Sequence, residues 1–415
     1  MMSDLIKQAE QAKKMAYQLA ILSTPAKNNA LKAIAIALRE DVAYLLNENK
    51  KDLESAEANG VAKPMLARLL IDEAAVEAMA IGVEQVATLP DPVGERVQSW
   101  VNEAGLRISE ERVPLGVIGI IYESRPNVTV DAAALCLKTG NATILRGGKE
   151  AIHSNRALVK VIQKALQPLQ LEFAVQLVQD TSRETAKELM KLNGFIDVLI
   201  PRGSAGLIQT VVKEATVPVI ETGTGNCHIY IDQSADLMQA IEIVSNAKVQ
   251  RPSACNAVET VLVHEEIAAE ILPRLVGTLE DQGVEIRGDE TVQAIKETVK
   301  EATVSDYETE FLDLILAIKV VPSTTAAIAH IAQYSTKHSE AILTNSYRDS
   351  QVFTKEVDAA VVYVNASTRF TDGFEFGFGA EIGISTQKLH ARGPMGLPQL
   401  TSIKYVVNGE GQLRR

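Results

Sequence analysis

The spacing of apolar residues along the first 90 residues is helical. In residues 3–90 apolar side chains recur three or four positions apart, as at Ala9, Ala12 and Met15, and such positions share one face of a helix. Two prolines within residues 89–92 prevent the helical region from continuing. The N-terminal part is therefore predicted to be a group of helices.

The pattern then changes to short alternating segments. Residues 97–103 and 106–113 alternate apolar and polar positions on either side of Ala104-Gly105, which predicts an exposed β-hairpin. The tail from Gly393 is rich in turn residues and then becomes extended over 402–407. This last segment is predicted to be a strand that can pair with another chain.

From residue 116 short apolar runs alternate with helical stretches. The first series has predicted strands at 117–122, 142–145, 174–178, 196–200 and 217–220, and predicted helices at 128–137, 154–166, 184–192 and 205–213. The second series has predicted strands at 229–231, 259–263, 317–321, 341–343 and 360–364, and predicted helices at 238–247 and 267–277. Repeated βα units of this length predict an α/β fold with parallel, doubly wound sheets.

Composition narrows the class of protein. A chain of 415 residues is long enough for two or three domains. The formal net charge of −12 argues against nucleic acid and anionic membranes as partners, so an anionic substrate would need a local cluster of positive groups. Three cysteines give no disulfide framework. With no apolar signal-peptide core and no run of about 18 apolar residues, a soluble cytoplasmic protein without a membrane partner is expected.

Generic metal and kinase motifs are missing from the sequence. Six scattered histidines form no His-x-x-x-His pair, and no Cys-x-x-Cys is present, so no metal site is expected. The segment Arg146-Gly147-Gly148-Lys149-Glu150 has neither the initial Gly nor the Ser or Thr of a phosphate loop. A kinase is therefore rejected.

Cys255 is the first candidate for chemistry. It lies in a polar loop between a predicted helix and a predicted strand, flanked by small residues and preceded by Lys248 and Arg251. Nearby cations favour a thiolate, which is the nucleophilic form of cysteine. The alternative is that Cys255 is a small buried filler, the commoner fate of a free cysteine.

The other two cysteines are weaker candidates. Cys136 lies in an apolar helical stretch and is predicted to belong to the core. Cys227 is the remaining rival, with His228 beside it. Neighbouring residues on a strand point to opposite faces, so a Cys227–His228 pair is not expected.

Two strand-to-helix turns are candidate anion sites. Residues 122–128 and residues 201–206 each close a predicted strand and open a predicted helix, where backbone amides can bind phosphate. The alternatives are an ordinary helix cap from Ser124 or Asn127 and an ordinary tight turn. Two such turns on one sheet favour a dinucleotide site at the carboxyl ends of the strands.

Several longer blocks carry a family resemblance. They begin at Ser124 (SRPNVTVDA), Lys138 (KTGNA), Arg146 (RGGKEA), Glu221 (ETGTGNCH), Arg251 (RPSACNAVET), Gly373 (GFEFGFGAEIGIST) and His390 (HARGPMGL). Together they resemble the γ-glutamyl phosphate reductases, also called glutamate-5-semialdehyde dehydrogenases, of the aldehyde dehydrogenase superfamily. The similarity extends from about residue 5 to residue 410.

The resemblance implies an aldehyde dehydrogenase-like α/β fold, with two doubly wound parallel-sheet domains and a small β oligomerisation flap. The implied cofactor-binding domain comprises residues 1–96 and 114–223, and the catalytic domain comprises 224–394. The flap combines 97–113 with 395–415, which makes a homo-oligomer the expected state.

The resemblance also implies a site for NADPH/NADP. Gly203 and Ser204 are expected against the pyrophosphate, Arg146 with Lys149 at a 2′-phosphate, and Glu310 at the nicotinamide ribose. The remaining residues expected at the cofactor are Arg125, Pro126, Gly147, Glu221, Thr222 and Gly223. Hydrolytic relatives keep a general base at the position of Glu221. A reductase does not need that water, so here Glu221 is expected to contact the cofactor or to hold its loop.

For catalysis the resemblance implies Cys255 as nucleophile. Ser124 occupies the place of the oxyanion-stabilising Asn of the superfamily and is expected to donate there with the Cys255 backbone N–H. The expected substrate residues are Asn256, Arg251 and Arg369, and Lys337 and Arg392 are further candidate anion partners. Each of these cations alone also fits a solvated surface charge.

The implied reaction is reduction of γ-glutamyl phosphate to glutamate-5-semialdehyde and phosphate, the second step of proline biosynthesis from glutamate, through a Cys255 thioacyl intermediate. A separate glutamate 5-kinase would supply the acyl phosphate, and a transient complex with it is a further expectation. The rival is a hydrolytic aldehyde dehydrogenase that uses Glu221 to activate water. A non-catalytic relative would be expected to lose the cysteine or the cofactor turns, and both are present.

Overall fold

The computed structural model describes residues 4–61, 66 and 68–414, and the chain forms two compact units. The first unit holds the described residues up to Thr222 together with 377–383 and those from Met395 onward. The second unit holds 223–376 and 384–394. The chain therefore passes between the units four times, and the domain roles given above to these ranges stay predictions.

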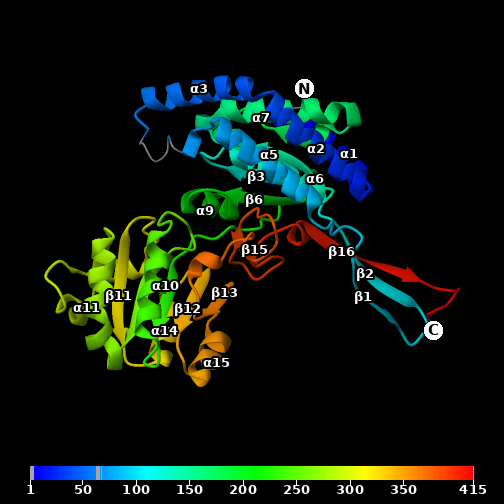
Figure 1. The fold of residues 1–415 in the computed structure, drawn as a ribbon. Helices are drawn as coiled ribbons and strands as arrows, with labels where there is room; N and C mark the ends of the chain where they lie inside the picture. Colours follow the sequence, from blue (N-terminus) through cyan, green and yellow to red (C-terminus); the bar gives the residue numbers. More distant parts are fainter. Residues whose placement is uncertain (1–3, 62–65, 67, 415) are drawn as a thin grey trace. The chain divides into compact units, whose positions relative to one another are not determined.

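The first unit opens with the predicted helices (Figure 1), which are α1 (Asp4–Leu19), α2 (Thr24–Glu40), α3 (Val42–Ala58) and α5 (Glu73–Thr88). The apolar stripe of α1, which includes Ala9, Ala12 and Met15, is buried as its spacing predicts. Helix α5 ends at Thr88, and the backbone of the next residue, Leu89, is extended. A residue before proline avoids the helical conformation, so Pro90 accounts for that end.

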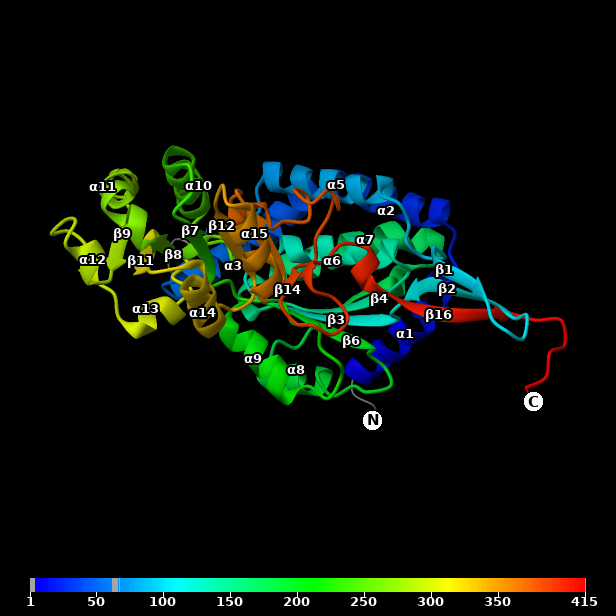
Figure 2. The ribbon, with the colours of Figure 1, turned by 90° about the horizontal axis from the view of Figure 1, so that it is seen from below.

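A parallel four-stranded sheet follows in the order β5-β4-β3-β6. Its strands are β3 (Val117–Tyr122), β4 (Ala142–Arg146), β5 (Val175–Leu177) and β6 (Val198–Arg202). Its helices are α6 (Asn127–Lys138), α7 (Ile152–Leu166), α8 (Arg183–Leu189) and α9 (Ala205–Glu214). Figure 2 shows α6 and α7 on one side of this sheet and α8 and α9 on the other. Every residue of β3 is buried, which explains its continuous apolar run.

The predicted strand at 217–220 is wrong. Only Val219 forms an isolated bridge, to Leu199 of β6. Pro218 has no N–H to donate to a ladder, and proline in an apolar run argues against a central strand. The segment closes the edge of the sheet with two hydrogen bonds, from Leu199 N–H to the Pro218 carbonyl and from Ile220 N–H to the Leu199 carbonyl.

A small antiparallel sheet completes the first unit. The predicted hairpin is confirmed as β1 (Arg96–Val101) and β2 (Arg107–Pro114), and the predicted tail strand as β16 (Thr401–Asn408). β16 pairs with β2 of the same chain, so β2 is central and β1 and β16 are the edges. All six residues of β1 are exposed.

The second unit is built on a parallel sheet of order β10-β9-β11-β8-β7-β12-β13. Its strands are β7 (Cys227–Ile231), β8 (Val258–His264), β9 (Glu285–Gly288), β10 (Lys300–Glu301), β11 (Ile315–Val321), β12 (Ser339–Leu343) and β13 (Val361–Val364). Its helices are α10 (Leu237–Val249), α11 (Glu265–Asp281), α12 (Glu290–Gln293), α13 (Val304–Glu308), α14 (Thr324–Tyr334) and α15 (Tyr347–Glu356). Two further short strands follow β13 in the sequence, β14 (Ile384–Ser385) and β15 (Gly393–Pro394), and they pair with each other in antiparallel fashion.

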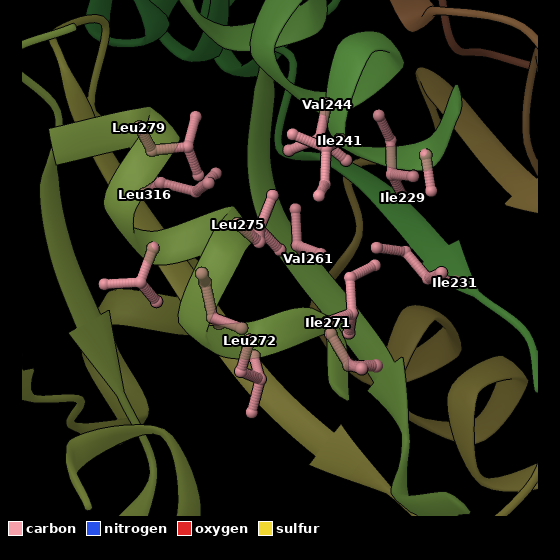
Figure 3. Close-up of a cluster of buried hydrophobic side chains, with 14 of the residues drawn as sticks. Ile229, Ile231, Ile241, Val244, Val261, Ile271, Leu272, Leu275, Leu279 and Leu316 are labelled. Atoms are coloured by element: carbon pink, nitrogen blue, oxygen red, sulfur yellow. The ribbon is translucent and has the colours of Figure 1, made fainter. Parts of the chain in front are cut away.

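Both faces of this sheet are covered by helices. Ile229 and Ile231 of β7 belong to a core cluster with α10 and α11, which Figure 3 shows in close-up. Tyr230, between them, belongs to a second cluster with α14 and α15. This alternation is the period of two of a strand buried on both faces.

The predicted arrangement of two doubly wound parallel sheets with a small antiparallel sheet is confirmed. Within the described ranges, no helix combines the length and the apolar character that crossing a bilayer requires.

Candidate functional site

Cys255 lies in a tight polar turn between α10 and β8, and its side chain is half-buried. An ion pair fixes both ends of this turn, because Nζ of Lys248 in the last turn of α10 lies 2.5 Å from a carboxylate oxygen of Glu259 on β8. Both side chains are fully buried, and burial raises the pKa of Glu259 to about 7. This buried ion pair therefore stabilises the turn that carries the thiol.

Gly225 supports the turn from the neighbouring segment before β7. A Cβ atom at residue 225 would overlap the carbonyl oxygen of Cys255 and lie 3.0 Å from its Cα atom. The Gly225 N–H donates to Oε1 of Glu310 at 2.7 Å. Glu310 is therefore joined to the Cys255 turn through Gly225, and burial raises the pKa of Glu310.

Arg369 is a cation that contacts the Cys255 turn. Its guanidinium donates to Oδ1 of Asn256 and to Oε1 of Gln250. Burial, followed by repulsion from Arg251, lowers the pKa of Arg369, and the charge of a Cys255 thiolate opposes that shift. Arg251 and Arg369 thus form a positive patch beside the thiol, which favours the thiolate.

Asn256 is buried and holds the turn to the segment around Arg369. Its Nδ2 donates to the carbonyl oxygens of Arg369 and Thr371, and its own carbonyl accepts from Thr368 Oγ1. The amide is therefore a structural contact in this structure, and its predicted contact with substrate stays a prediction.

Lys337 and Arg392 both pair with an acid in the second unit. Together with Lys388 they surround Asp358, at 2.9–3.2 Å. These three cations lower the pKa of Asp358. One carboxylate balances only one of these three positive charges, so Lys337 and Arg392 stay predicted anion partners.

Cys227 is buried beneath the Cys255 turn. Its Sγ donates to the Cys255 carbonyl oxygen at 3.3 Å, and burial raises the pKa of its thiol far above the ordinary value. As predicted, His228 does not pair with it, because the His228 ring contacts Glu340 at 3.1 Å. The imidazole near Cys227 is that of His338, at 3.8 Å.

In the first unit, Ser124 occupies a strained turn between β3 and α6. Its φ is 38°, a conformation uncommon for any residue except glycine. Its N–H and its Oγ both donate to Oε1 of Glu150 at 2.8 Å. Neither Ser124 nor Asn127 caps α6, since the cap residue is Pro126 and it has no side-chain hydrogen bond. Strain of this kind gathers at functional turns.

The turn at Gly203 and Ser204 binds an anion within its own unit. Ser204 caps α9, and its N–H donates to a carboxylate oxygen of Glu123 at 2.8 Å. A Cβ atom added to Gly203 would lie only 2.5 Å from a carboxylate oxygen of Glu123, which is too close for a side chain at residue 203. An anion at a helix N-terminus is the arrangement expected for a pyrophosphate.

Arg146 ends β4, and its guanidinium is only partly satisfied. Nη2 donates to the carbonyl oxygens of Thr181 and Ser182, whereas the buried Nε has no partner among the described residues. Burial lowers the pKa of Arg146. Gly147 next to it is buried, and Lys149 is exposed. The unpartnered Nε and the anion-binding turn at Ser204 both fit the phosphates of a dinucleotide.

The other predicted cofactor residues lie either directly after Ser124 or in residues 221–223, where the chain leaves the first unit. Arg125 is exposed and Pro126 is buried directly after Ser124. Glu221 is half-buried, and Thr222 is buried with its Oγ1 donating to the Pro201 carbonyl at 2.7 Å. Gly223, the first residue of the second unit, donates its N–H to the Ile384 carbonyl.

Sequence reasoning did not single out Glu123, Glu150, Gly225 or Glu259. Acidic residues are abundant in this chain, so a single one carries little signal. Of these four residues, only Gly225 belongs to a recognisable sequence pattern, because it is the last residue of a Gly-Thr-Gly triplet.

Comparisons with known proteins agree with the fold. The model of the aldehyde dehydrogenase family matches residues 2–295. A γ-glutamyl phosphate reductase of Enterococcus faecalis is 59% identical over 99% of both chains, and one of Lactiplantibacillus plantarum is 58% identical over 100% of both.

Solved structures give the same result. A γ-glutamyl phosphate reductase of Thermotoga maritima has a TM-score of 0.98 and 50% identity over 100% of both chains. An acetylating aldehyde dehydrogenase of Geobacillus thermoglucosidasius, at 18% identity, has a TM-score of 0.70 and shares the fold. The chain therefore belongs to the aldehyde dehydrogenase family and, within it, to the γ-glutamyl phosphate reductases.

Proposed function

We propose that this chain reduces γ-glutamyl phosphate to glutamate-5-semialdehyde and phosphate with NADPH, as a step of proline biosynthesis. The observation that carries the proposal is the 59% identity, over 99% of both chains, to a protein named γ-glutamyl phosphate reductase. The positive patch beside Cys255 supports it, because the proposed substrate is an anion that reacts with a thiolate.

In the proposed mechanism the Cys255 thiolate attacks the acyl carbon of γ-glutamyl phosphate. Arg251 and Arg369 attract the phosphate, which leaves with the electron pair of the C–O bond, and a thioester of Cys255 remains. Ser124 and the Cys255 N–H are the proposed donors to the oxyanion, as the family resemblance implies. A cofactor held by Arg146, Lys149, Gly203, Ser204 and Glu310 would supply the hydride. Cys255 then leaves as the thiolate, and the aldehyde is released.

The test is the reverse reaction of the purified protein. NADP⁺ reduction with glutamate-5-semialdehyde should appear only when phosphate or arsenate is present, and NAD⁺ should be the poorer acceptor. Cys255→Ala should abolish it, with Cys227→Ala as the matched control for loss of a nearby thiol. Turnover that is indifferent to phosphate would overturn the proposal and favour a hydrolytic dehydrogenase with Glu221 as general base.

The assembly is a second proposal. The β1–β2–β16 sheet exposes apolar side chains, among them Trp100 at 40%, Val101 at 63% and Tyr405 at 59%, and exposed apolar surface of this kind marks interaction sites. We assign it to contact with a second copy of the chain. Sedimentation should show a dimer or larger species that Trp100→Glu dissociates, and a monomeric wild type would refute the assignment.

Two further expectations stay proposals. A thiol nucleophile works in a reducing compartment, so a cytoplasmic location is proposed for the chain, in which Cys255 forms no disulfide. A transient complex with a separate glutamate 5-kinase is proposed because acyl phosphates hydrolyse readily. Cross-linking of the two purified proteins should recover it, and failure at high concentrations of both would contradict it.

A further inference from the structure

A pocket in the first unit lies beside the Ser124 turn and has no role in the mechanism above. Its volume is about 350 Å³, and it lies between residues 68–79 and the start of α6. Ligand pockets begin at about 300 Å³. Pro126 and Asn127, two and three residues after Ser124, form part of its wall. The pocket therefore adjoins the turn that is proposed to bind the reacting carbonyl.

The pocket wall contains one acid and one base among otherwise uncharged residues. The acid is Asp131 on α6, and the base is Arg68, whose side chain is exposed. Most of the remaining wall is apolar and includes Met79 of α5. A wall of this kind suits a ligand with a short hydrocarbon chain and two opposite charges.

Asp131 has little internal compensation for its charge. Nδ2 of Asn127 donates a hydrogen bond to its Oδ2 at 3.0 Å. Arg202 acts on it electrostatically but forms no ion pair with it among the described residues. Burial raises the pKa of Asp131 to about 6. A bound cation would relieve that desolvation cost.

The apolar wall fits the hydrocarbon part of the proposed substrate. In an extended glutamyl chain the ammonium nitrogen lies about 5 Å from the reacting carbon, four bonds away. The methylene groups between them would pack on that wall.

We infer that this pocket holds the amino-acid head of the substrate, with Asp131 binding the α-ammonium group and Arg68 the α-carboxylate. The inference rests on the proposed function, because the reacting end of the same substrate is assigned to Ser124 and Cys255. It makes Asp131 and Arg68 determinants of specificity that act on substrate binding and not on the chemical step.

The experiment compares glutamate-5-semialdehyde with 5-oxopentanoate, which differs only in lacking the amino group. Asp131→Asn should raise KM for glutamate-5-semialdehyde about 10-fold or more. The same substitution should leave KM for 5-oxopentanoate within about 2-fold of the wild-type value, since that substrate makes no ammonium contact. Asp72→Asn is the matched control, because Asp72 caps α5 next to the pocket, is absent from its wall, and Asn caps equally well.

Arg68→Gln tests the other half. It should raise KM for both substrates, which share the carboxylate, and should leave pentanal unaffected. Equal effects of Asp131→Asn on both substrates would refute the inference, as would no effect on either. A wild-type protein without phosphate-dependent activity would instead refute the proposed function, so the two failures are distinguishable.

Discussion

Gly225→Ala is expected to inactivate the protein without unfolding it, although the change adds one methyl group. Residue 225 does not have positive φ, so alanine is allowed by its backbone. The constraint is steric, because the new Cβ would lie 3.0 Å from the Cα of Cys255 and would overlap the carbonyl oxygen of the same residue.

The size of the effect follows from that distance. Non-bonded carbon atoms are at their optimum about 3.5–4.0 Å apart, so the Cα that carries the reactive thiol must move by at least about 0.5–1 Å, and the overlapped carbonyl oxygen must move further. Misplacement by about 1 Å can cost about 100-fold in rate. Overpacking should lower the free energy of unfolding by about 1–3 kcal/mol. We therefore expect kcat to fall about 100-fold in a protein that is still folded.

The assay is kcat for phosphate-dependent NADP⁺ reduction, with the free energy of unfolding measured in urea. Gly277→Ala is the matched control, since it makes the same change in the same unit, inside α11, with no atom within 4 Å of the new Cβ. It should keep its activity and gain up to about 1 kcal/mol of stability. A folded Gly225→Ala protein with kcat within about 3-fold of wild type would refute the argument that Gly225 positions the thiol.

Three other changes test separate parts of the structure. Burial lowers the pKa of His338 to about 4, from 6.5 in the unfolded chain, so the unfolded state binds the proton more readily and stability falls as the pH drops from 6.5 to 4. The loss in the free energy of unfolding is on the order of 3 kcal/mol. His338→Gln should weaken this dependence of stability on pH, measured by urea unfolding at several pH values. An unchanged dependence on pH would contradict the assignment to His338. Glu123→Gln should tighten NADP⁺ about 10-fold in a fluorescence titration, because a carboxylate no longer competes for the Ser204 N–H; weaker binding would show that Glu123 assists the cofactor. Arg146→Gln should reduce the preference for NADPH over NADH in kcat/KM by about 10-fold or more, since a charged donor to the 2′-phosphate is lost, and an unchanged ratio would remove Arg146 from that role.

The fold was largely predictable because its central strands are buried on both faces. A strand such as β3, with all six residues buried, has no polar position to interrupt its apolar run. β9 and β10 were missed because they are short strands rich in charged residues at one end of the sheet. The error at 217–220 has the opposite cause, since an apolar run suggested a strand that Pro218 prevents.

The candidate site was predictable only for residues whose role can be recognised from their neighbours in the sequence. Cys255 could be selected from its polar, cationic surroundings in the sequence. Its contact with Gly225 could not, because the two residues are 30 positions apart and meet only when β7 pairs with β8. Glu150 and Glu123 were missed for a related reason. The partner of Glu150 is Ser124 and the partner of Glu123 is Ser204, and each serine follows a different strand from its glutamate.

The return of the chain to its first unit has a consequence for synthesis on the ribosome. The four-stranded sheet is complete in sequence before Thr222, but β2 acquires β16 only when residues 401–408 have emerged. The buried amide of Asn141 likewise waits for the carbonyl of Leu400, 259 residues later. At about 5–20 residues per second, the 286 residues between Pro114 and Thr401 take roughly 15–60 s. During that interval one edge of β2 lacks its partner strand, and an unpaired edge of this kind can pair with a strand of another chain.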